Sequence, residues 1–182
     1  MTADEKARLR EQFRIARRER AERDRSVTFD LLLASPEIRS AKTIASYISY
    51  GTEPSTEEIN RTFLNSGINL VLPRISTTGI QWVSWDGNQE NLTLAGRILE
   101  PVGPEFNDLG SIDVVIVPAL HIDSDGYRLG KGGGYYDRAL PAMSGWKVGL
   151  IFSGELTDEI LPRERHDVPL AAAATPDGVV RF

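Results

Sequence analysis

The sequence contains no cysteine, and this absence excludes several classes of chemistry. Disulfide bonds, zinc sites with cysteine ligands and thiol nucleophiles all require that residue. Long apolar segments are also missing, since no run approaches the roughly 20 residues that cross a bilayer. The N-terminal segment opens with charged residues and lacks the apolar stretch of a signal peptide. We therefore expect a cytoplasmic protein without a membrane partner.

The composition is typical of a globular protein, with 41% hydrophobic and 26% charged residues among 182. This length suits one core, so we expect residues 1–182 to form a single domain, and we expect a monomer. The net charge is -5, but residues 1–25 hold nine Lys or Arg against six Asp or Glu. A basic segment on an acidic chain indicates a local anion site and no nucleic-acid partner.

Three segments predict helices. Residues 3–24 contain no Gly or Pro and are rich in Ala, Arg, Glu and Leu, which favours a helix. A second helix is expected around residues 27–34. A third is expected from Ser55 to about Asn65, because Ser55 and Glu58 have the spacing of a capping box.

Strand-like segments alternate with these helices. Residues 43–48, 68–72, 112–117, 146–152 and 179–182 are apolar and rich in β-branched residues, which predicts strands. Pro73 is expected to stop the second of them. Residues 81–85 alternate polar and apolar side chains, as an edge strand does. Residues 86–111 show little periodicity and predict a long connection. The order predicts an α/β protein with a mainly parallel central sheet flanked by helices.

A glycine-rich segment contains the residues that are most informative about function. The strand at 112–117 leaves the sheet at Pro118, and a run of glycines with Lys131 follows at residues 130–134. Glycine lets backbone N–H groups approach an anion, and ligands collect at the carboxyl ends of strands in α/β sheets. A helix after Gly134 would add its dipole. The spacing is not that of a Walker A loop. These residues therefore indicate either an anion site or a glycine-rich surface turn.

The exact order of amino acids in this segment favours the anion site over the surface turn. Residues 123–138 read Asp-x-x-Gly-x-Arg-Leu-Gly-Lys-Gly-x-Gly-Tyr-Tyr-Asp-Arg, which resembles the signature of the 5-formyltetrahydrofolate cyclo-ligase family. Shorter features of that family occur in the right order, such as Leu72-Pro73-Arg74 and Glu100-Pro101. The resemblance covers nearly the whole chain. It implies a single-domain layered fold of the NagB/RpiA/CoA-transferase type.

The resemblance also implies a reaction. Members of this family convert 5-formyltetrahydrofolate to 5,10-methenyltetrahydrofolate with ATP and Mg²⁺. Phosphorylation of the formyl oxygen makes it a leaving group, N10 attacks the activated carbon, and the five-membered ring closes. Catalysis of phosphoryl transfer depends mainly on positioning and electrostatics. ATP and a reduced folate are therefore the expected partners.

The resemblance assigns residues to three roles. Lys131 and Arg128 are the expected catalytic residues, with Lys131 stabilising the transferring phosphoryl group. The residues expected to bind ATP are Lys6, Arg10, Arg128, Leu129, Gly130, Lys131, Gly132, Gly133, Gly134, Tyr135 and Tyr136. Those expected to bind the folate are Ile48, Glu53, Lys131, Gly132, Gly133, Gly134 and Tyr135, with Glu53 reading the donor groups of the pterin.

The expected Mg²⁺ ligands are Asp137 and Asp167, because magnesium commonly takes one or two carboxylates together with phosphates and waters. Without the resemblance, Asp137 is also compatible with a helix N-terminal carboxylate and Asp167 with a loop residue. Lys6 and Arg10 share a helical face with Arg14. We expect Arg14 and the later arginines to form a solvated basic face.

Two other functions stay open at this point. The first is an ATP-dependent enzyme acting on a different small-molecule acceptor, for which the family-atypical pair His121-Ile122 is the one hint. The second is a protein that binds a reduced folate without catalysis. We expect neither His121 nor His166 to act as a general base, since transfer to a carbonyl oxygen needs no deprotonated nucleophile.

Overall fold

The computed structural model describes residues 3–24 and 27–182. A seven-stranded sheet forms the centre, in the order β12-β11-β9-β6-β1-β2-β3, and its five inner strands are parallel. The strands of this sheet are β1 (Thr43–Ala45), β2 (Asn69–Ile75), β3 (Ile80–Ser84), β6 (Val114–Pro118), β9 (Trp146–Leu150), β11 (Ala172–Thr175) and β12 (Gly178–Arg181). The predicted mainly parallel sheet is confirmed.

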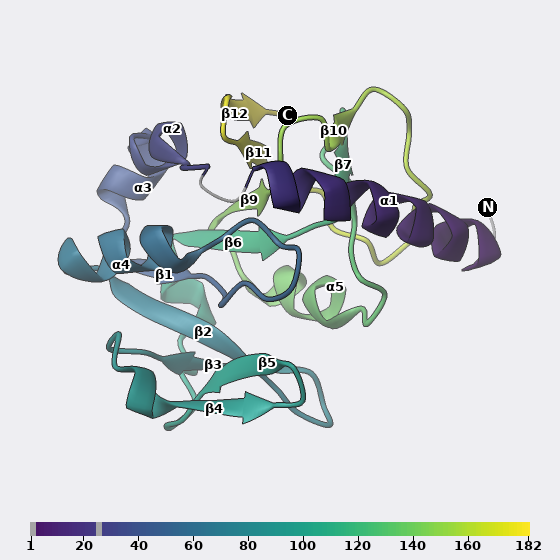
Figure 1. Cartoon of the computed structure of the whole chain (residues 1–182). Helices are drawn as coiled ribbons and strands as arrows, with labels where there is room; N and C mark the ends of the chain where they lie inside the picture. The colour runs from purple at the N-terminus through teal and green to yellow at the C-terminus, as the bar shows by residue number, and fades with distance from the viewer. Residues whose placement is uncertain (1–2, 25–26) are drawn as a thin grey trace.

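In the described part of the chain, two small sheets and five α-helices complete the fold (Figure 1). One small sheet pairs β4 (Leu92–Ala95) with β5 (Ile98–Pro101), and the other joins β7 (His121–Asp123), β8 (Arg128–Leu129) and β10 (Leu156–Thr157). The helices are α1 (Ala3–Arg23), α2 (Asp30–Leu33), α3 (Pro36–Ser40), α4 (Glu57–Asn65) and α5 (Tyr135–Ala139). Short 3₁₀ turns lie at Gln89–Asn91, Leu109–Ser111 and Leu140–Ala142.

The core lies on both faces of the central sheet. Because side chains alternate along a strand, Val114 and Ile116 pack with one cluster, while Val115 and Val117 pack with the other. The first cluster includes Phe63 of α4 and other residues of α2–α4, and the second includes residues around α5. Strand β6 is apolar along its length because both of its faces are covered.

Several predicted boundaries are wrong for identifiable reasons. Strand β2 continues through Pro73 to Ile75. Pro73 is tolerated because β1 ends opposite Val71, which leaves Pro73 with only the antiparallel neighbour β3. The helix expected at 27–34 is the four-residue α2, and Pro36 begins α3 at a position where its missing N–H costs nothing.

The capping box expected before α4 is also absent. Thr56 occupies the N-cap position, and its hydroxyl donates to the backbone oxygen of Tyr47 at 2.7 Å. The long connection expected at 86–111 contains the β4–β5 hairpin, which the sequence analysis missed.

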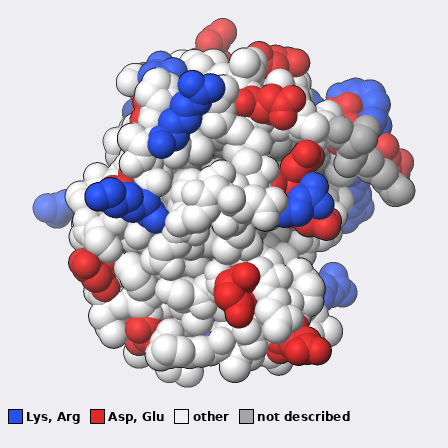
Figure 2. Space-filling view, turned by 90° about the vertical axis from the view of Figure 1, so that its left-hand side faces the viewer, with Lys and Arg blue, Asp and Glu red and all other residues white. Residues whose placement is uncertain are grey.

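The surface carries charges of both signs. On the face shown in Figure 2, Lys and Arg side chains are interspersed with Asp and Glu among the described residues. Within residues 3–24 and 27–182, none of the helices combines the length and apolar character needed to cross a membrane.

Candidate functional site

A cavity of about 380 Å³ lies where three adjacent parallel strands end. Pro118 at the end of β6, Tyr47 just after β1 and Ile75 at the end of β2 all line it. Because the strands are parallel, their carboxyl ends meet at one edge of the sheet, which is where α/β proteins bind ligands. The prediction that the glycine run lies near such an edge is confirmed.

All the residues that the sequence analysis assigned to ATP, folate or metal line this one cavity. They come from α1, the segment after β1, the segment from β8 to α5, and the loop after β10. The set comprises Lys6, Arg10, Ile48, Glu53, Arg128, Leu129, Gly130, Lys131, Gly132, Gly133, Gly134, Tyr135, Tyr136, Asp137 and Asp167.

The glycine run presents unpaired backbone donors. Arg10 Nε donates to the Gly130 carbonyl at 3.1 Å, and an Arg14 guanidinium nitrogen donates to the Lys131 carbonyl at 2.8 Å. None of the backbone N–H groups of residues 130–134 donates to another group among the described residues. Gly132 and Gly134 have φ of 106° and 63°, conformations that favour glycine. Helix α1 thus holds the carbonyls while the amides stay available.

The short helix after this run contributes less than expected. Helix α5 has only five residues, so its macrodipole is small. The free amides and the neighbouring cations are therefore the main groups at this place that attract an anion.

One side of the cavity carries Lys6, Arg10 and Arg128, and we call it the cationic side. Acidic side chains lie between these cations. Lys6 Nζ lies 2.9 Å from an oxygen of Asp167 and 2.9 Å from an oxygen of Glu164. Burial lowers the pKa of Lys6, but the hydrogen bonds to both acids outweigh it and hold that pKa above its usual value. Burial raises the pKa of Asp167, and the hydrogen bond from Lys6 reverses this to a net lowering. Both groups are therefore charged at neutral pH.

A second ion pair joins Arg128 to Asp137, with 2.6 Å between nitrogen and oxygen. The Arg128 side chain is 5% exposed, so little water screens this pair. Each predicted metal ligand is thus paired with a base that the sequence analysis assigned to ATP.

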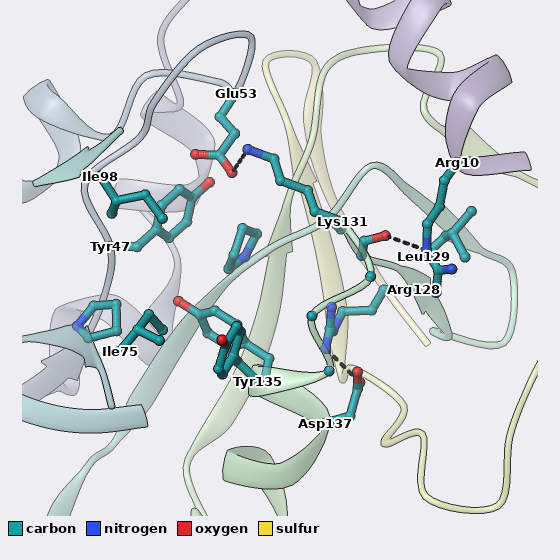
Figure 3. A pocket seen from close by; sticks show the side chains of 18 of the residues that line it. Arg10, Tyr47, Glu53, Ile75, Ile98, Arg128, Leu129, Lys131, Tyr135 and Asp137 are labelled. Carbon is teal, nitrogen blue, oxygen red and sulfur yellow. Dashed lines mark hydrogen bonds and ion pairs between the residues drawn. The ribbon is translucent and has the colours of Figure 1, made fainter. Parts of the chain in front are cut away.

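Lys131 reaches across the cavity toward Glu53 (Figure 3). Its Nζ lies 2.7 Å from an oxygen of Glu53 and 3.5 Å from the ring centre of Tyr50, a cation–π distance. The other oxygen of Glu53 accepts the N–H of Tyr50.

The opposite side of the cavity is apolar. Figure 3 shows Tyr47, Ile75 and Ile98 on one side, with Arg10, Arg128 and Asp137 on the other. The hydroxyls of Tyr47 and Tyr136 are buried and have no partner among the described residues. Burial raises the pKa of both phenols, so they remain protonated hydrogen-bond donors.

Sequence reasoning missed the residues of this apolar side. Ile98, Leu99 and Glu100 belong to the β4–β5 hairpin, whose strands are separated by Gly96 and Arg97. A two-residue turn that begins with glycine between two short β-prone runs is a hairpin signal, and it was present in the sequence. The cavity is also lined by Tyr47, Tyr50, Pro73, Ile75, Pro118, Ala119, Glu164 and His166.

Comparison with known proteins places this site in a family. Residues 2–176 match the model of the 5-formyltetrahydrofolate cyclo-ligase family. The chain belongs to this family. A 5-formyltetrahydrofolate cyclo-ligase of Mycolicibacterium smegmatis is 34% identical over 146 residues, covering 75% of each chain. The enzyme of the same name from Escherichia coli K12 is 30% identical and covers 81% of this chain and 85% of its own.

A solved structure agrees with the cyclo-ligase fold. The NMR structure of Aquifex aeolicus 5,10-methenyltetrahydrofolate synthetase superposes with a TM-score of 0.81 at 30% identity. The match covers 97% of this chain and 92% of that one.

The arginines of α1 do more in this cyclo-ligase family member than form a solvated face. Arg14 binds the glycine loop, and Arg17 is 1% exposed. Arg17 forms a buried ion pair with Glu155 and donates to the Leu120 carbonyl at 3.1 Å. The expectation for Arg14 and Arg17 is therefore wrong, because the face that carries Lys6 and Arg10 continues onto the body of the protein.

His121 and Trp82 lie outside the cavity, whereas His166 is on its wall. His121 is buried and stacks on Phe13 of α1, with 3.9 Å between ring centres, and it does not line the cavity. The atypical pair His121-Ile122 therefore gives no support to a different acceptor. Trp82 is 2% exposed and belongs to the core.

Proposed function

We propose that this protein converts 5-formyltetrahydrofolate to 5,10-methenyltetrahydrofolate and consumes ATP in the reaction. Family membership and the names of the relatives support this conversion. The observation that carries the ATP requirement is the free amide run of residues 130–134, flanked by Arg128 and facing the same cavity as an apolar wall. Such a cavity accommodates a polyanion at one end and an aromatic ring system at the other.

The chemistry explains why a triphosphate is needed. The formyl group on N5 is an amide, and its oxygen is a poor leaving group. The formyl oxygen attacks the γ-phosphorus, the bond to the β-phosphate oxygen breaks, and ADP leaves. N10 then attacks the activated formyl carbon and loses its proton, and the five-membered ring closes as phosphate departs with the former formyl oxygen and takes up a proton. The products are the methenyl compound, ADP and phosphate.

The cationic side of the cavity is the proposed site for the triphosphate. The amides of residues 130–134 would donate to phosphate oxygens, with Lys6, Arg10 and Arg128 supplying positive charge. Arg10 is fixed by its hydrogen bond to Gly130, and Arg128 by its pair with Asp137. These contacts hold the cations in position before the nucleotide enters, which lowers the entropy cost of binding it.

Lys131 is the proposed catalytic cation, together with Arg128. Its backbone belongs to the glycine run, and its ammonium contacts Glu53 on the side proposed for the folate. A flexible lysine at this place can turn from Glu53 to the transferring phosphoryl group as charge develops on it.

Magnesium is the proposed metal, held by Asp137 and Asp167. The cavity wall contains four Lys or Arg side chains and five Asp or Glu side chains, so a triphosphate would enter a site without excess positive charge. A divalent cation would reduce this repulsion and screen the phosphate charge. No cluster of three or more His, Cys, Asp or Glu suited to a metal occurs among the described residues, so phosphates and waters would complete the coordination.

The folate is proposed to lie against Ile48 and Glu53 and along residues 131–135. This places the formyl group beside Lys131. No feature of the cavity favours another phosphate acceptor or a binder without catalysis.

The test is the appearance of product. Purified protein mixed with 5-formyltetrahydrofolate, ATP and Mg²⁺ should increase the absorbance of the methenyl chromophore. Omission of ATP, or chelation of the metal, should abolish the increase. A folded protein that forms no product with all components present contradicts the proposal, and turnover that persists in a chelator contradicts the role of magnesium.

A further inference from the structure

Glu100 is a buried carboxylate on the wall of the cavity. It lies on β5 and is 6% exposed. One of its oxygens accepts the N–H of Ile75 at 2.9 Å, which joins the β4–β5 hairpin to the end of β2. Its other oxygen has no hydrogen-bond partner among residues 3–24 and 27–182.

Glu100 differs in its partners from the other acids of the cavity wall. Glu53 pairs with Lys131, Asp137 pairs with Arg128, and Glu164 and Asp167 both pair with Lys6. No Lys, Arg or His of the described chain lies within ion-pair distance of Glu100. It is the one acid on this wall that lacks a basic partner in the described structure.

The surroundings of Glu100 make this arrangement costly. Ile75, Ile98 and Leu99 line the same part of the cavity. Burial of a carboxylate among apolar side chains is unfavourable unless hydrogen bonds compensate for the lost water. One backbone N–H occupies only one of the four acceptor positions of a carboxylate. A ligand that presents N–H donors to an apolar pocket would fill the others.

We propose that Glu100 recognises the amino-pyrimidinone edge of the substrate's pterin ring. This edge carries the N3–H and the 2-amino group side by side, two parallel donors that match the two oxygens of a carboxylate. Charge-assisted bidentate pairs of this kind are stronger and more directional than neutral hydrogen bonds. The inference rests on the proposed function, since it names the residue that reads the folate of that same reaction.

Glu53 and Glu100, the two glutamates on the side proposed for the folate, have different roles. Glu53 accepts the Lys131 ammonium on one oxygen and the N–H of Tyr50 on the other, so both of its oxygens have a partner. Glu100 offers open acceptor positions. In this proposal Glu53 positions Lys131 beside the formyl group, and Glu100 takes the pterin-reading role that the family resemblance implies for Glu53.

The experiment measures the dissociation constant of 5-formyltetrahydrofolate by calorimetry without ATP. Glu100→Gln keeps an oxygen for the Ile75 N–H but places an amide N–H2 against one of the pterin donors. We expect roughly 10- to 100-fold weaker folate binding, with an unchanged KM for ATP. Glu105→Gln, an exposed glutamate on the neighbouring segment, is the matched control and should bind as the wild type does.

A folate analogue makes the test specific for the edge that is recognised. Replacement of the 2-amino group by methyl should weaken binding to the wild type at least 10-fold, whereas Glu100→Gln should discriminate much less between substrate and analogue. Equal binding of both ligands by the wild type overturns the proposal, even if the variant does not fold. Loss of discrimination in Glu53→Gln with full discrimination in Glu100→Gln also overturns it.

These outcomes separate the proposal from the function on which it rests. If the wild type forms product but Glu100→Gln binds folate normally, the inference on Glu100 is wrong and the cyclo-ligase activity stands. If the wild type binds the folate with the expected discrimination but forms no product, the activity is wrong and the role of Glu100 stands. If the wild type does not bind 5-formyltetrahydrofolate, both are wrong.

Discussion

At the scale of single residues, Lys131 connects the two sides of the cavity. Its ammonium is shared between Glu53 and the face of Tyr50, while its backbone belongs to the loop proposed for the phosphates. The side chain is 35% exposed, so it contributes little to the core. Its contacts fit a group that moves between two partners during the reaction.

We predict that Lys131→Ala lowers kcat by roughly 10²- to 10³-fold, because the transferring phosphoryl group loses a positioned cation. The free energy of unfolding should fall by about 1 to 3 kcal/mol, because Glu53, whose side chain is 5% exposed, loses its charged partner. Product absorbance and urea denaturation measure the two effects. Lys42→Ala, which removes an exposed lysine outside the cavity, should leave both unchanged. Unfolding of the Lys131 variant would contradict this assignment.

His121 connects pH to stability. Burial, the main cause, and the nearby positive charge of Arg20 lower its pKa to about 4, from a usual value of 6.5. Between these values the unfolded chain binds a proton that the folded protein does not. This contribution to stability is therefore complete above the unfolded pKa and decreases as the pH falls toward 4.

We predict that the free energy of unfolding falls by about 2 to 3 kcal/mol more in the wild type than in His121→Phe when the pH is lowered from about 7.5 to about 4.5. Phenylalanine keeps the stacking on Phe13 but does not titrate. Denaturant titrations of both proteins at the two pH values measure the difference. An equal loss in the two proteins would show that His121 is not responsible.

At the scale of secondary-structure elements, helix α1 determines whether the cationic side of the cavity exists. Figure 1 shows it lying beside β7 and β10. Its Lys6 and Arg10 reach the cavity, and its Arg17 fixes it to the body through Glu155 and the Leu120 carbonyl. The part of the helix around Arg17 thus positions the part that faces the proposed nucleotide site.

We predict that Arg17→Ala destabilises the protein by roughly 3 kcal/mol, because Glu155 is left as a buried charge without its partner. The KM for ATP should rise as well, since Lys6 and Arg10 are no longer held in place. Arg18→Ala removes an exposed arginine of the same helix and is the matched control. In Arg17→Met combined with Glu155→Gln, much of the lost stability should return. Equal effects of the Arg17 and Arg18 variants would refute the docking role.

The β4–β5 hairpin was not predicted, although its two-residue turn is visible in the sequence. Leu94 is 66% exposed and Glu100 is buried, so the hairpin has no simple alternation of apolar and polar residues. Ile98, Leu99 and Glu100 line a cavity that other segments complete, so they do not pack into a continuous apolar core. The Gly96-Arg97 turn was therefore the only local signal for this hairpin, because its strands lack the alternation on which strand prediction depends.

At the scale of the whole molecule, residues 1–182 are predicted to form one domain. The two core clusters lie on opposite faces of one sheet and share its strands, so neither can be exposed alone. We predict a single cooperative unfolding transition, with tryptophan fluorescence and far-UV circular dichroism giving the same midpoint. Two separated transitions would contradict the one-domain prediction.

The sequence by itself determined most of the main helices and strands, the mainly parallel sheet and the glycine-rich loop, because these depend on local periodicity and on residue identities within one short segment. Strand β11, Ala172–Thr175 of the central sheet, was not predicted. Only the tertiary structure decided which distant residues meet: Lys6 with Asp167, Lys131 with Glu53, Arg17 with Glu155. It also revealed that Glu100 faces the cavity without a basic partner among the described residues. Such pairings depend on how elements pack against one another, and the spacing along the chain carries no information about them.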